Sequence, residues 1–345
     1  MLEFFHTDLS SLDPPVADII QNEAERQGRK LILIPSESQA PEAVREALGS
    51  VFQNIYAEGY PDPSLHGVSQ EEIRNYEIQL AFHRRYSDRR YYKGVEYANI
   101  IEALAQRRAA EAFAANDIPP EEIWANVQPL SGSPANSAVY SALVPLGSTV
   151  MGMDLLHGGH LTHGSPANRS GKSYNIVSYG IDPKTERLDY AAIEELARKH
   201  QPQMIIAGYT SYPWMPDWAR FRQIADAVGA YLLADISHIA GMVAAGVVPS
   251  PVGHAHAISF TTHKTLYGPR GACILTTDKK LARKVDAAVF PGEQGGPHVN
   301  AIAGMAVAFE LAKSPQFGQL QQQVVDNARH LAKELERHGL RIPYG

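Results

Sequence analysis

The chain has 345 residues with a formal net charge of −6, and 20% of its residues are charged. This composition is that of an ordinary globular protein, and it lacks the basic excess that would attract nucleic acid or anionic lipid. No stretch approaches the roughly 18 apolar residues of a membrane span, and the N-terminus lacks the pattern of a secretory signal. The single cysteine, Cys273, lies in an apolar run and can form no internal disulfide. We therefore expect a cytoplasmic protein with no nucleic-acid or membrane partner.

The first part of the chain predicts an amphipathic helical arm followed by further helices. At roughly 150 residues per domain, the length suggests about two domains. Residues 14–30 carry apolar side chains at helical spacing. Ser36 follows a proline and precedes a helix start, so on local grounds a helix cap explains it as well as a binding role does. Residues 70–86 predict another helix with a basic end, favoured as a packed surface helix over an element that binds a partner or gates a site.

A strand, a glycine turn and a helix follow one another after residue 122. Residues 123–127 are strand-like, Ser131-Gly132-Ser133 forms the turn, and a helical pattern follows. Backbone N–H groups at a helix N-terminus, together with serine hydroxyls, suit a phosphate dianion. We therefore expect Ser131, Gly132 and Ser133 to bind phosphate, although such a tripeptide alone is more often a simple turn.

Three histidines, His157, His160 and His163, recur every third residue. Zinc sites use similar spacings, but the intervening Gly158-Gly159 disfavours a helix and no nearby cysteine or carboxylate completes a tetrahedral set. We predict no metal site here.

Strands and helices then alternate as in a parallel α/β sheet. The predicted strands are 174–179, 204–208, 231–235 and 255–261, and the predicted helices are 190–200, 217–228, 299–312 and 316–338. Asp235 ends a buried strand, where open α/β sheets place their ligands. Lys264 lies among hydroxyl-bearing residues, and a lysine that bonds to an aldehyde must lose its proton near neutral pH, which burial favours. The alternative is an exposed loop lysine.

Several strings of residues support one family in particular. They are Pro35-Ser36-Glu37-Ser38, Tyr56-Ala57-Glu58-Gly59-Tyr60, Arg90-Tyr91-Tyr92, Ser131-Gly132-Ser133, His157 to Gly164, Thr261 to Lys264 and Gly292 to Pro297. On these strings, from about residue 33 to residue 323, the chain resembles the serine hydroxymethyltransferase family. The resemblance implies an α/β fold-type I pyridoxal-phosphate transferase, aspartate-aminotransferase-like, with a mostly parallel sheet and helices on both faces. It implies reversible conversion of L-serine and tetrahydrofolate to glycine and 5,10-methylenetetrahydrofolate.

The resemblance also implies the cofactor contacts. Pyridoxal 5'-phosphate would be bound covalently by Lys264, with Asp235 at the pyridine nitrogen and His160 stacked on the ring. The further cofactor-binding residues expected from the family are Tyr56, Ser131, Gly132, Ser133, Thr210, His238, Thr261, His263, Gly295 and Gly296. On local grounds a buried capping histidine explains His238 equally well.

The catalytic set implied by the family adds two residues to Lys264, His160 and Asp235. Glu58 would handle protons near the substrate hydroxyl and the folate, and Tyr92 would lie close to the reacting substrate. The other substrate-binding residues expected are Ser36, Tyr91, Gly158, Gly159, Leu161 and Arg270. Taken alone, a glutamate in a turn is usually just exposed, and adjacent tyrosines usually serve packing.

The family comparison also predicts the domains and the assembly. We expect an N-terminal arm at 1–35, a large pyridoxal-phosphate domain at 36–313 with an inserted helix at about 62–89, and the start of a truncated C-terminal small domain at 314–345. In the family, the loop Gly292–Pro297 crosses a dimer interface, which implies a homodimer or a dimer of dimers. The small-molecule partners are serine, glycine and folate.

Two alternatives remain open from the sequence. A threonine-aldolase-like enzyme would share the lysine chemistry but ignore folate. A non-catalytic cofactor-binding or dimerising fragment would follow from the expected lack of the C-terminal domain, whose arginine pairs with the substrate carboxylate in the family.

Overall fold

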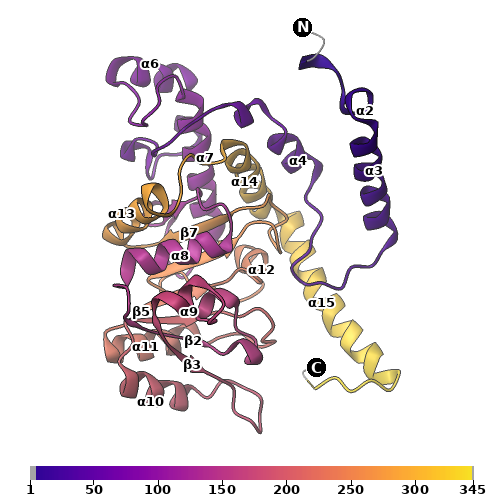
Figure 1. The fold of residues 1–345 in the computed structure, drawn as a ribbon, viewed down its shortest axis with the longest axis vertical. Coiled ribbons are helices and arrows are strands. Elements are labelled where there is room, and N and C mark those ends of the chain that lie inside the picture. Colours follow the sequence, from indigo (N-terminus) through magenta and orange to yellow (C-terminus); the bar gives the residue numbers. More distant parts are fainter. Residues whose placement is uncertain (1–4, 344–345) are drawn as a thin grey trace. The chain divides into compact units, whose positions relative to one another are not determined.

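The computed structural model describes residues 5–343 (Figure 1). It contains two compact units, residues 1–37 and residues 38–345. The N-terminal unit contains α2 (Leu9–Leu12) and α3 (Pro14–Arg29). The Asp13 side chain accepts a hydrogen bond from the Val16 N–H, and Pro14 occupies the first turn, so α3 begins where the sequence predicts it. The predicted domain boundaries at 35/36 and 313/314 stay predictions.

The strands of the large unit form one sheet of seven within the described residues. They are β1 (Trp124–Asn126), β2 (Thr149–Met153), β3 (Asn175–Tyr179), β4 (Met204–Ala207), β5 (Tyr231–Asp235), β6 (Ala257–Thr261) and β7 (Ala272–Thr276). Their order is β1-β7-β6-β5-β4-β2-β3. Neighbours from β6 to β3 run parallel, whereas β7 runs antiparallel to both β6 and β1. The expectation of a mostly parallel sheet is confirmed.

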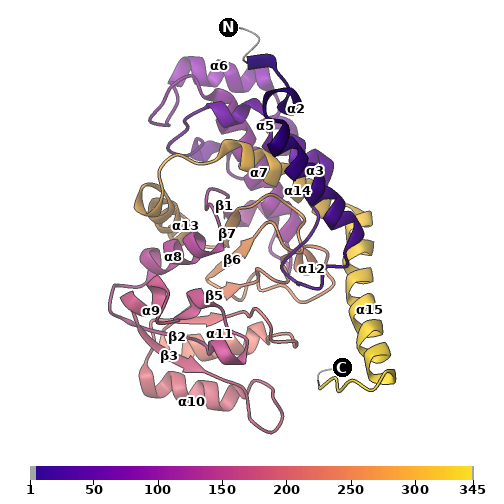
Figure 2. The same cartoon turned by 45° about the vertical axis from the view of Figure 1, so that its right-hand side comes forward.

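Helices connect and cover these strands (Figure 2). They are α4 (Glu42–Leu48), α5 (Gln70–Ile73), α6 (Tyr76–Tyr86), α7 (Glu96–Phe113), α8 (Gly132–Leu143), α9 (Arg169–Ser173), α10 (Tyr190–His200), α11 (Trp218–Val228), α12 (Ala240–Ala244), α13 (Lys279–Ala287), α14 (Val299–Ala312) and α15 (Pro315–Arg337). Short 3₁₀ turns are η1 (Val51–Asn54), η2 (Pro63–Leu65), η3 (Pro120–Glu122), η4 (Leu155–His157) and η5 (Leu161–His163), and η6 (Ala288–Glu293) is a kinked π-helical turn. The loop Gly292–Pro297 therefore belongs to this turn up to Glu293 and is irregular after it.

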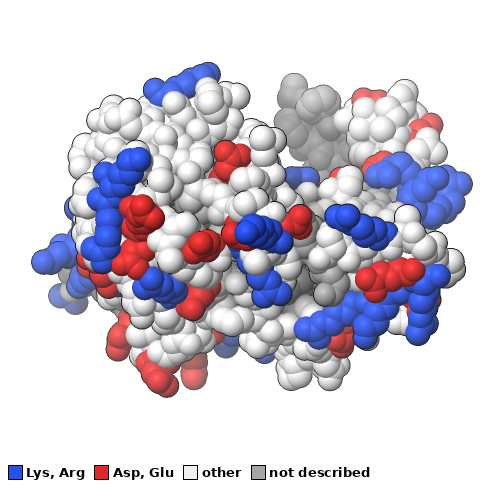
Figure 3. All heavy atoms as spheres, turned by 90° about the horizontal axis from the view of Figure 1, so that it is seen from below, with Lys and Arg blue, Asp and Glu red and all other residues white. Residues whose placement is uncertain are grey.

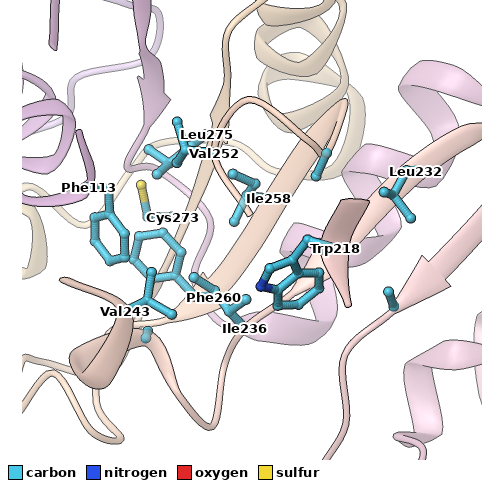
Figure 4. Close-up of a cluster of buried hydrophobic side chains, with 14 of the residues drawn as sticks. Phe113, Trp218, Leu232, Ile236, Val243, Val252, Ile258, Phe260, Cys273 and Leu275 are labelled. Atoms are coloured by element: carbon cyan, nitrogen blue, oxygen red, sulfur yellow. The ribbon is translucent and has the colours of Figure 1, made fainter. Parts of the chain in front are cut away.

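Alternate residues of the central strands supply two apolar cores, one on each face of the sheet. Ile205 and Leu232 pack with α7, α10, α11 and α14, whereas Met204 and Leu233 pack with α8 and α13. Figure 4 shows part of the first core, in which Phe113 of α7 stacks on Phe260 of β6 with ring centroids 4.5 Å apart. A sheet buried on both faces needs near-continuous apolar strands, which is what these sequences provide.

The antiparallel strand β7 gives the fold a feature that positions the site. Because β6 and β7 form a hairpin, the loop between them returns to the edge of the sheet where β4 and β5 also end. The Thr262 N–H donates to the Gly271 carbonyl (3.1 Å) and the Gly268 N–H to the Thr262 carbonyl (2.8 Å), which closes this loop. Lys264 lies within it.

The segment 62–89 differs from the single helix predicted for 70–86, and its assignment as an insertion stays a prediction. Asn75 caps a new helix by accepting a hydrogen bond from the Ile78 N–H, so the segment divides into α5 and α6. The first half is anchored, since Ile73 is fully buried against α7. Helix α6 lies at the end of the large unit opposite α10 (Figures 1 and 2). Asp62 and Arg89, at the two ends of this segment, form an ion pair at 3.6 Å.

The surface carries both signs of charge. On the face shown in Figure 3, Lys and Arg side chains lie among Asp and Glu side chains. Among the described residues, no helix combines the length and the apolar character needed to cross a membrane.

Candidate active site

A cavity of about 260 Å³ lies at the carboxyl edge of β4, β5 and β6. Helix α8 begins there at Gly132, directly after Ser131. The backbone N–H groups of a first helical turn have no partners within the helix and attract anions. A Cβ at Gly132 would lie 2.8 Å from Cγ2 of Thr261, so only glycine permits this close approach. Together with Ser133, this turn can hold a phosphate.

Asp235 is buried at the end of β5 and is held by several donors. Its Oδ2 accepts from Nδ2 of Asn136 (2.8 Å) and lies 3.0 Å from Nε2 of His163, while its Oδ1 accepts from the Ser237 hydroxyl (2.6 Å). Burial alone would raise the pKa of Asp235, but the bonds from His163, Ser237 and Asn136 outweigh burial and lower it. The group is therefore a carboxylate over the whole physiological pH range.

A chain of hydrogen bonds extends from Asp235 to His160. Nδ2 of Asn136 also donates to the Thr162 hydroxyl (2.9 Å), which lies 2.7 Å from Nδ1 of His160. The Thr162 N–H donates to the same Nδ1 (3.2 Å). Nδ1 of His160 is therefore an acceptor, and Nε2 carries the proton of the neutral ring. Burial lowers the pKa of His160 and favours this neutral form.

The loop that carries Lys264 is fixed from several sides. The Ser38 hydroxyl donates to the Lys264 carbonyl (2.7 Å), and Nε2 of Gln321 in α15 donates to the Thr265 carbonyl (2.7 Å). Burial is the main cause of a lowered Lys264 pKa; the Asp235 charge opposes it and the Arg270 charge adds to it. The amine thus loses its proton more readily than an exposed lysine, as a nucleophilic amine requires.

Two further histidines line the cavity in neutral form. Burial, followed by the Lys264 charge, lowers the pKa of His238 to about 4. Burial, followed by the Arg270 charge, lowers the pKa of His263 to about 4. Within the described residues, the buried Thr261 hydroxyl and Nδ1 of His263 have no hydrogen-bond partner. Unpaired buried polar groups that line a cavity are available to hydrogen-bond a ligand.

The structure brings most of the predicted cofactor residues to this one cavity. Its lining includes Ser131, Gly132, Ser133, His160, Thr210, Asp235, His238, Thr261, His263, Lys264 and Arg270. Gly158 lies beside it, since its carbonyl accepts from the Thr210 N–H (2.8 Å), and Gly159 follows within the same turn. Leu161 is half exposed next to His160. Ser36 belongs to the N-terminal unit, and its role stays a prediction.

The remaining predicted residues form a second group, none of which lines the first cavity. The rings of Tyr56 and Tyr92 lie 5.0 Å apart. A Cβ at Gly295 would lie 3.4 Å from Oε1 of Glu58, and a Cβ at Gly296 would lie 3.2 Å from Cε1 of Tyr56. Tyr56 and Gly296 border a separate hollow of about 310 Å³. Tyr91 is exposed and packs edge-on against Phe290.

A third cavity, of about 220 Å³, contains none of the predicted site residues. It lies beside β1, α13 and residues 60–67. On its wall, Nδ2 of Asn126 donates to Oδ1 of Asp286 (2.7 Å) and to the Tyr60 hydroxyl (3.0 Å).

Sequence reasoning missed the residues that hold Asp235. Asn136 and His163 lie far from Asp235 in the sequence, and the spacing of His163 suggested only a metal pattern. A signal was present for Asn136, because it follows Ser133 by three residues and so points from the same helix face as the phosphate turn.

Pyridoxal phosphate needs a site for its phosphate, a carboxylate for its pyridine nitrogen and an amine for its aldehyde, and this cavity has all three. A mostly parallel α/β sheet that presents these groups at its carboxyl edge defines a fold-type I pyridoxal-phosphate-dependent transferase. The sequence model of the family described as serine hydroxymethyltransferase matches residues 9–85 and 78–345. The chain belongs to this family.

Proposed function

We propose that the chain transfers the hydroxymethyl group of L-serine reversibly to tetrahydrofolate, giving glycine and 5,10-methylenetetrahydrofolate. The observation that carries this proposal is the convergence of the Lys264 amine, the Asp235 carboxylate and the N-terminus of α8 on one cavity. The buried free thiol of Cys273 is compatible with a cytoplasmic enzyme.

The cavity residues divide the work of holding the cofactor. Ser131, Gly132 and Ser133 would hold the phosphate, and Lys264 would hold the aldehyde carbon covalently. The Asp235 carboxylate would keep the pyridine nitrogen protonated. When bound, pyridoxal phosphate supplies an electron sink for the electrons released at the amino-acid Cα.

Neighbouring residues would orient the ring and the substrates. His160 would stack on the ring, while Thr210, His238, Thr261 and His263 would contact its polar edge. The turn from Gly158 to Leu161 would face the folate, and Ser36, Tyr91 and Arg270 would contact the amino-acid substrate.

The second group would complete the site of a second copy of the chain. Glu58 would move protons at the substrate hydroxyl and Tyr92 would lie near it, with Tyr56, Gly295 and Gly296 at the cofactor. The separation of this group from the cavity of its own chain supports a homodimer as the working unit.

The first test measures turnover of serine by the purified chain with and without tetrahydrofolate. Folate-dependent formation of glycine supports the transferase, whereas folate-independent cleavage favours the aldolase alternative. Cofactor binding without turnover indicates a non-catalytic module.

The second test concerns the lysine. K264A should lose the cofactor that borohydride reduction fixes to the wild-type chain, and K199A, on the exposed side of α10, should retain it. Fixed cofactor in K264A contradicts the assignment.

A further inference from the structure

Arg90 is among the most deeply buried charged side chains of the described residues. It is 1% exposed, and its Nη2 lies 2.6 Å from Oε2 of Glu102, which is fully buried in α7. A buried arginine is costly unless every donor is paired. The partners of its remaining donors therefore indicate what the residue is for.

Those partners lie on both sides of Glu58. Nη1 of Arg90 donates to the carbonyl of Ala57 (2.7 Å) and to the carbonyl of Gly59 (2.9 Å). The next residue, Tyr91, donates its N–H to the carbonyl of Glu58 itself (3.0 Å). Three consecutive carbonyls are thus held by two consecutive residues, so the Cα of Glu58 is fixed although its side chain is partly exposed.

A second layer fixes the guanidinium. Nε donates to Oδ1 of Asn99 (2.8 Å). Nε2 of Gln128 donates both to Oε1 of Glu102 and to the Gly59 carbonyl, each at 2.8 Å. The planar fork of arginine can satisfy these directions together, which a single ammonium cannot.

The segment is also packed too closely to shift as a unit. Gly59 has φ +111°, and a Cβ there would lie 3.1 Å from the Cα of Arg90. The Glu58 backbone is therefore held by hydrogen bonds on one side and by direct contact with residue 90 on the other.

We propose that Arg90, supported by Glu102, is a positioning residue that sets the place of the Glu58 carboxyl for proton transfer. The inference rests on the proposed function, which supplies the proton-transfer step assigned to Glu58. A buried ion pair adds little net stability compared with apolar residues of similar size, so its contribution is the defined geometry of residues 57–59. A displacement of about 1 Å at a reacting group can cost about 10²-fold in rate.

The experiment uses the cofactor-loaded chain and the paired variant R90M/E102L, which removes both buried charges together. We expect the pair to fold and bind cofactor, with kcat for serine lowered about 10²-fold and KM changed less than about threefold. E58Q, alone and in the R90M/E102L background, completes a double-mutant cycle. If Arg90 acts through Glu58, the triple variant is no slower than E58Q. Multiplicative losses, or full activity in R90M/E102L, overturn the proposal.

Two further measurements keep the outcomes distinct. Amide hydrogen exchange should speed up in residues 55–60 and at Tyr91 in R90M/E102L, and unchanged protection there overturns the inference even if the chain proves not to be a transferase. If R90M/E102L fails to fold, R90K replaces it, because R90K keeps one positive charge next to Glu102. R90K should speed up amide exchange in the same residues, but by less.

The matched control is R222M/D226N in α11. Arg222 also pairs with a carboxylate and donates to a backbone carbonyl, that of His254 (3.0 Å), but it lies away from Glu58. The R222M/D226N variant should leave kcat and the amide exchange of residues 55–60 unchanged. If the wild-type chain itself has no transferase activity, that result contradicts the proposed function but not the positioning of Glu58 by Arg90.

Discussion

D286N should stabilise the protein at neutral pH. Asp286 lies on the wall of the third cavity, where burial raises the pKa of its carboxyl from the usual 3.8 to about 6. Its Oδ1 accepts one hydrogen bond from Asn126, and asparagine keeps that acceptor. The folded state binds the Asp286 proton more tightly than the unfolded chain does. The free energy of unfolding therefore falls as pH rises from about 3.8 to about 6, and it stays at the lower value above pH 6.

The expected size follows from the pKa difference. At about 1.36 kcal/mol per unit, ionised Asp286 costs about 3 kcal/mol above pH 6. D286N should gain up to about that amount at pH 8 and roughly half of it at pH 5. Urea unfolding at the two pH values measures both gains. A D286N gain equal at both pH values, or a loss at pH 8, refutes the reasoning.

Three other substitutions test the cofactor cavity. G132A should weaken pyridoxal-phosphate binding at least tenfold in equilibrium dialysis, because its Cβ would meet a threonine methyl at 2.8 Å; unchanged affinity would contradict the phosphate assignment. G208A should lower the free energy of unfolding by more than about 2 kcal/mol, because Gly208 has φ +130° and a Cβ there would lie 2.0 Å from the Asp235 carbonyl. G246A, with φ +68° and open space around it, should cost less, and equal losses would be evidence against the clash. H163F should weaken cofactor binding by about tenfold to 100-fold, since a hydrogen bond to a charged group is worth about 1.5–3 kcal/mol, and unchanged binding would show that Asp235 does not depend on it.

Segments with strong local signals were predicted closely. The strand Tyr231–Asp235 and the helix Tyr190–His200 have the bounds expected from their apolar patterns. The break between α5 and α6 was missed, because apolar spacing continues across residue 75 while the side chain of Asn75 starts a new helix. A capping side chain favours a new helix start, whereas continuous apolar spacing favours one helix. The sequence pattern alone does not show which of the two effects is stronger.

The site was predicted less completely than the fold. The strings that resemble the family pointed to Lys264, Asp235 and the phosphate turn, but the donors to Asp235 depend on contacts between residues far apart in the chain. The division of the predicted residues into two groups likewise depends on where the loop after Glu293 lies. Motif order carries no information on which members share a cavity.

The Asp62–Arg89 ion pair joins the two ends of segment 62–89, so the chain enters and leaves this segment at nearly the same place. A segment with adjacent ends is a natural point of evolutionary growth, since doubling its length costs only about 0.6 kcal/mol of loop-closure entropy. We therefore expect a change in the length of helix α6 to cost the rest of the fold little. The same property makes the tip of this segment a suitable attachment point for a grafted reporter domain.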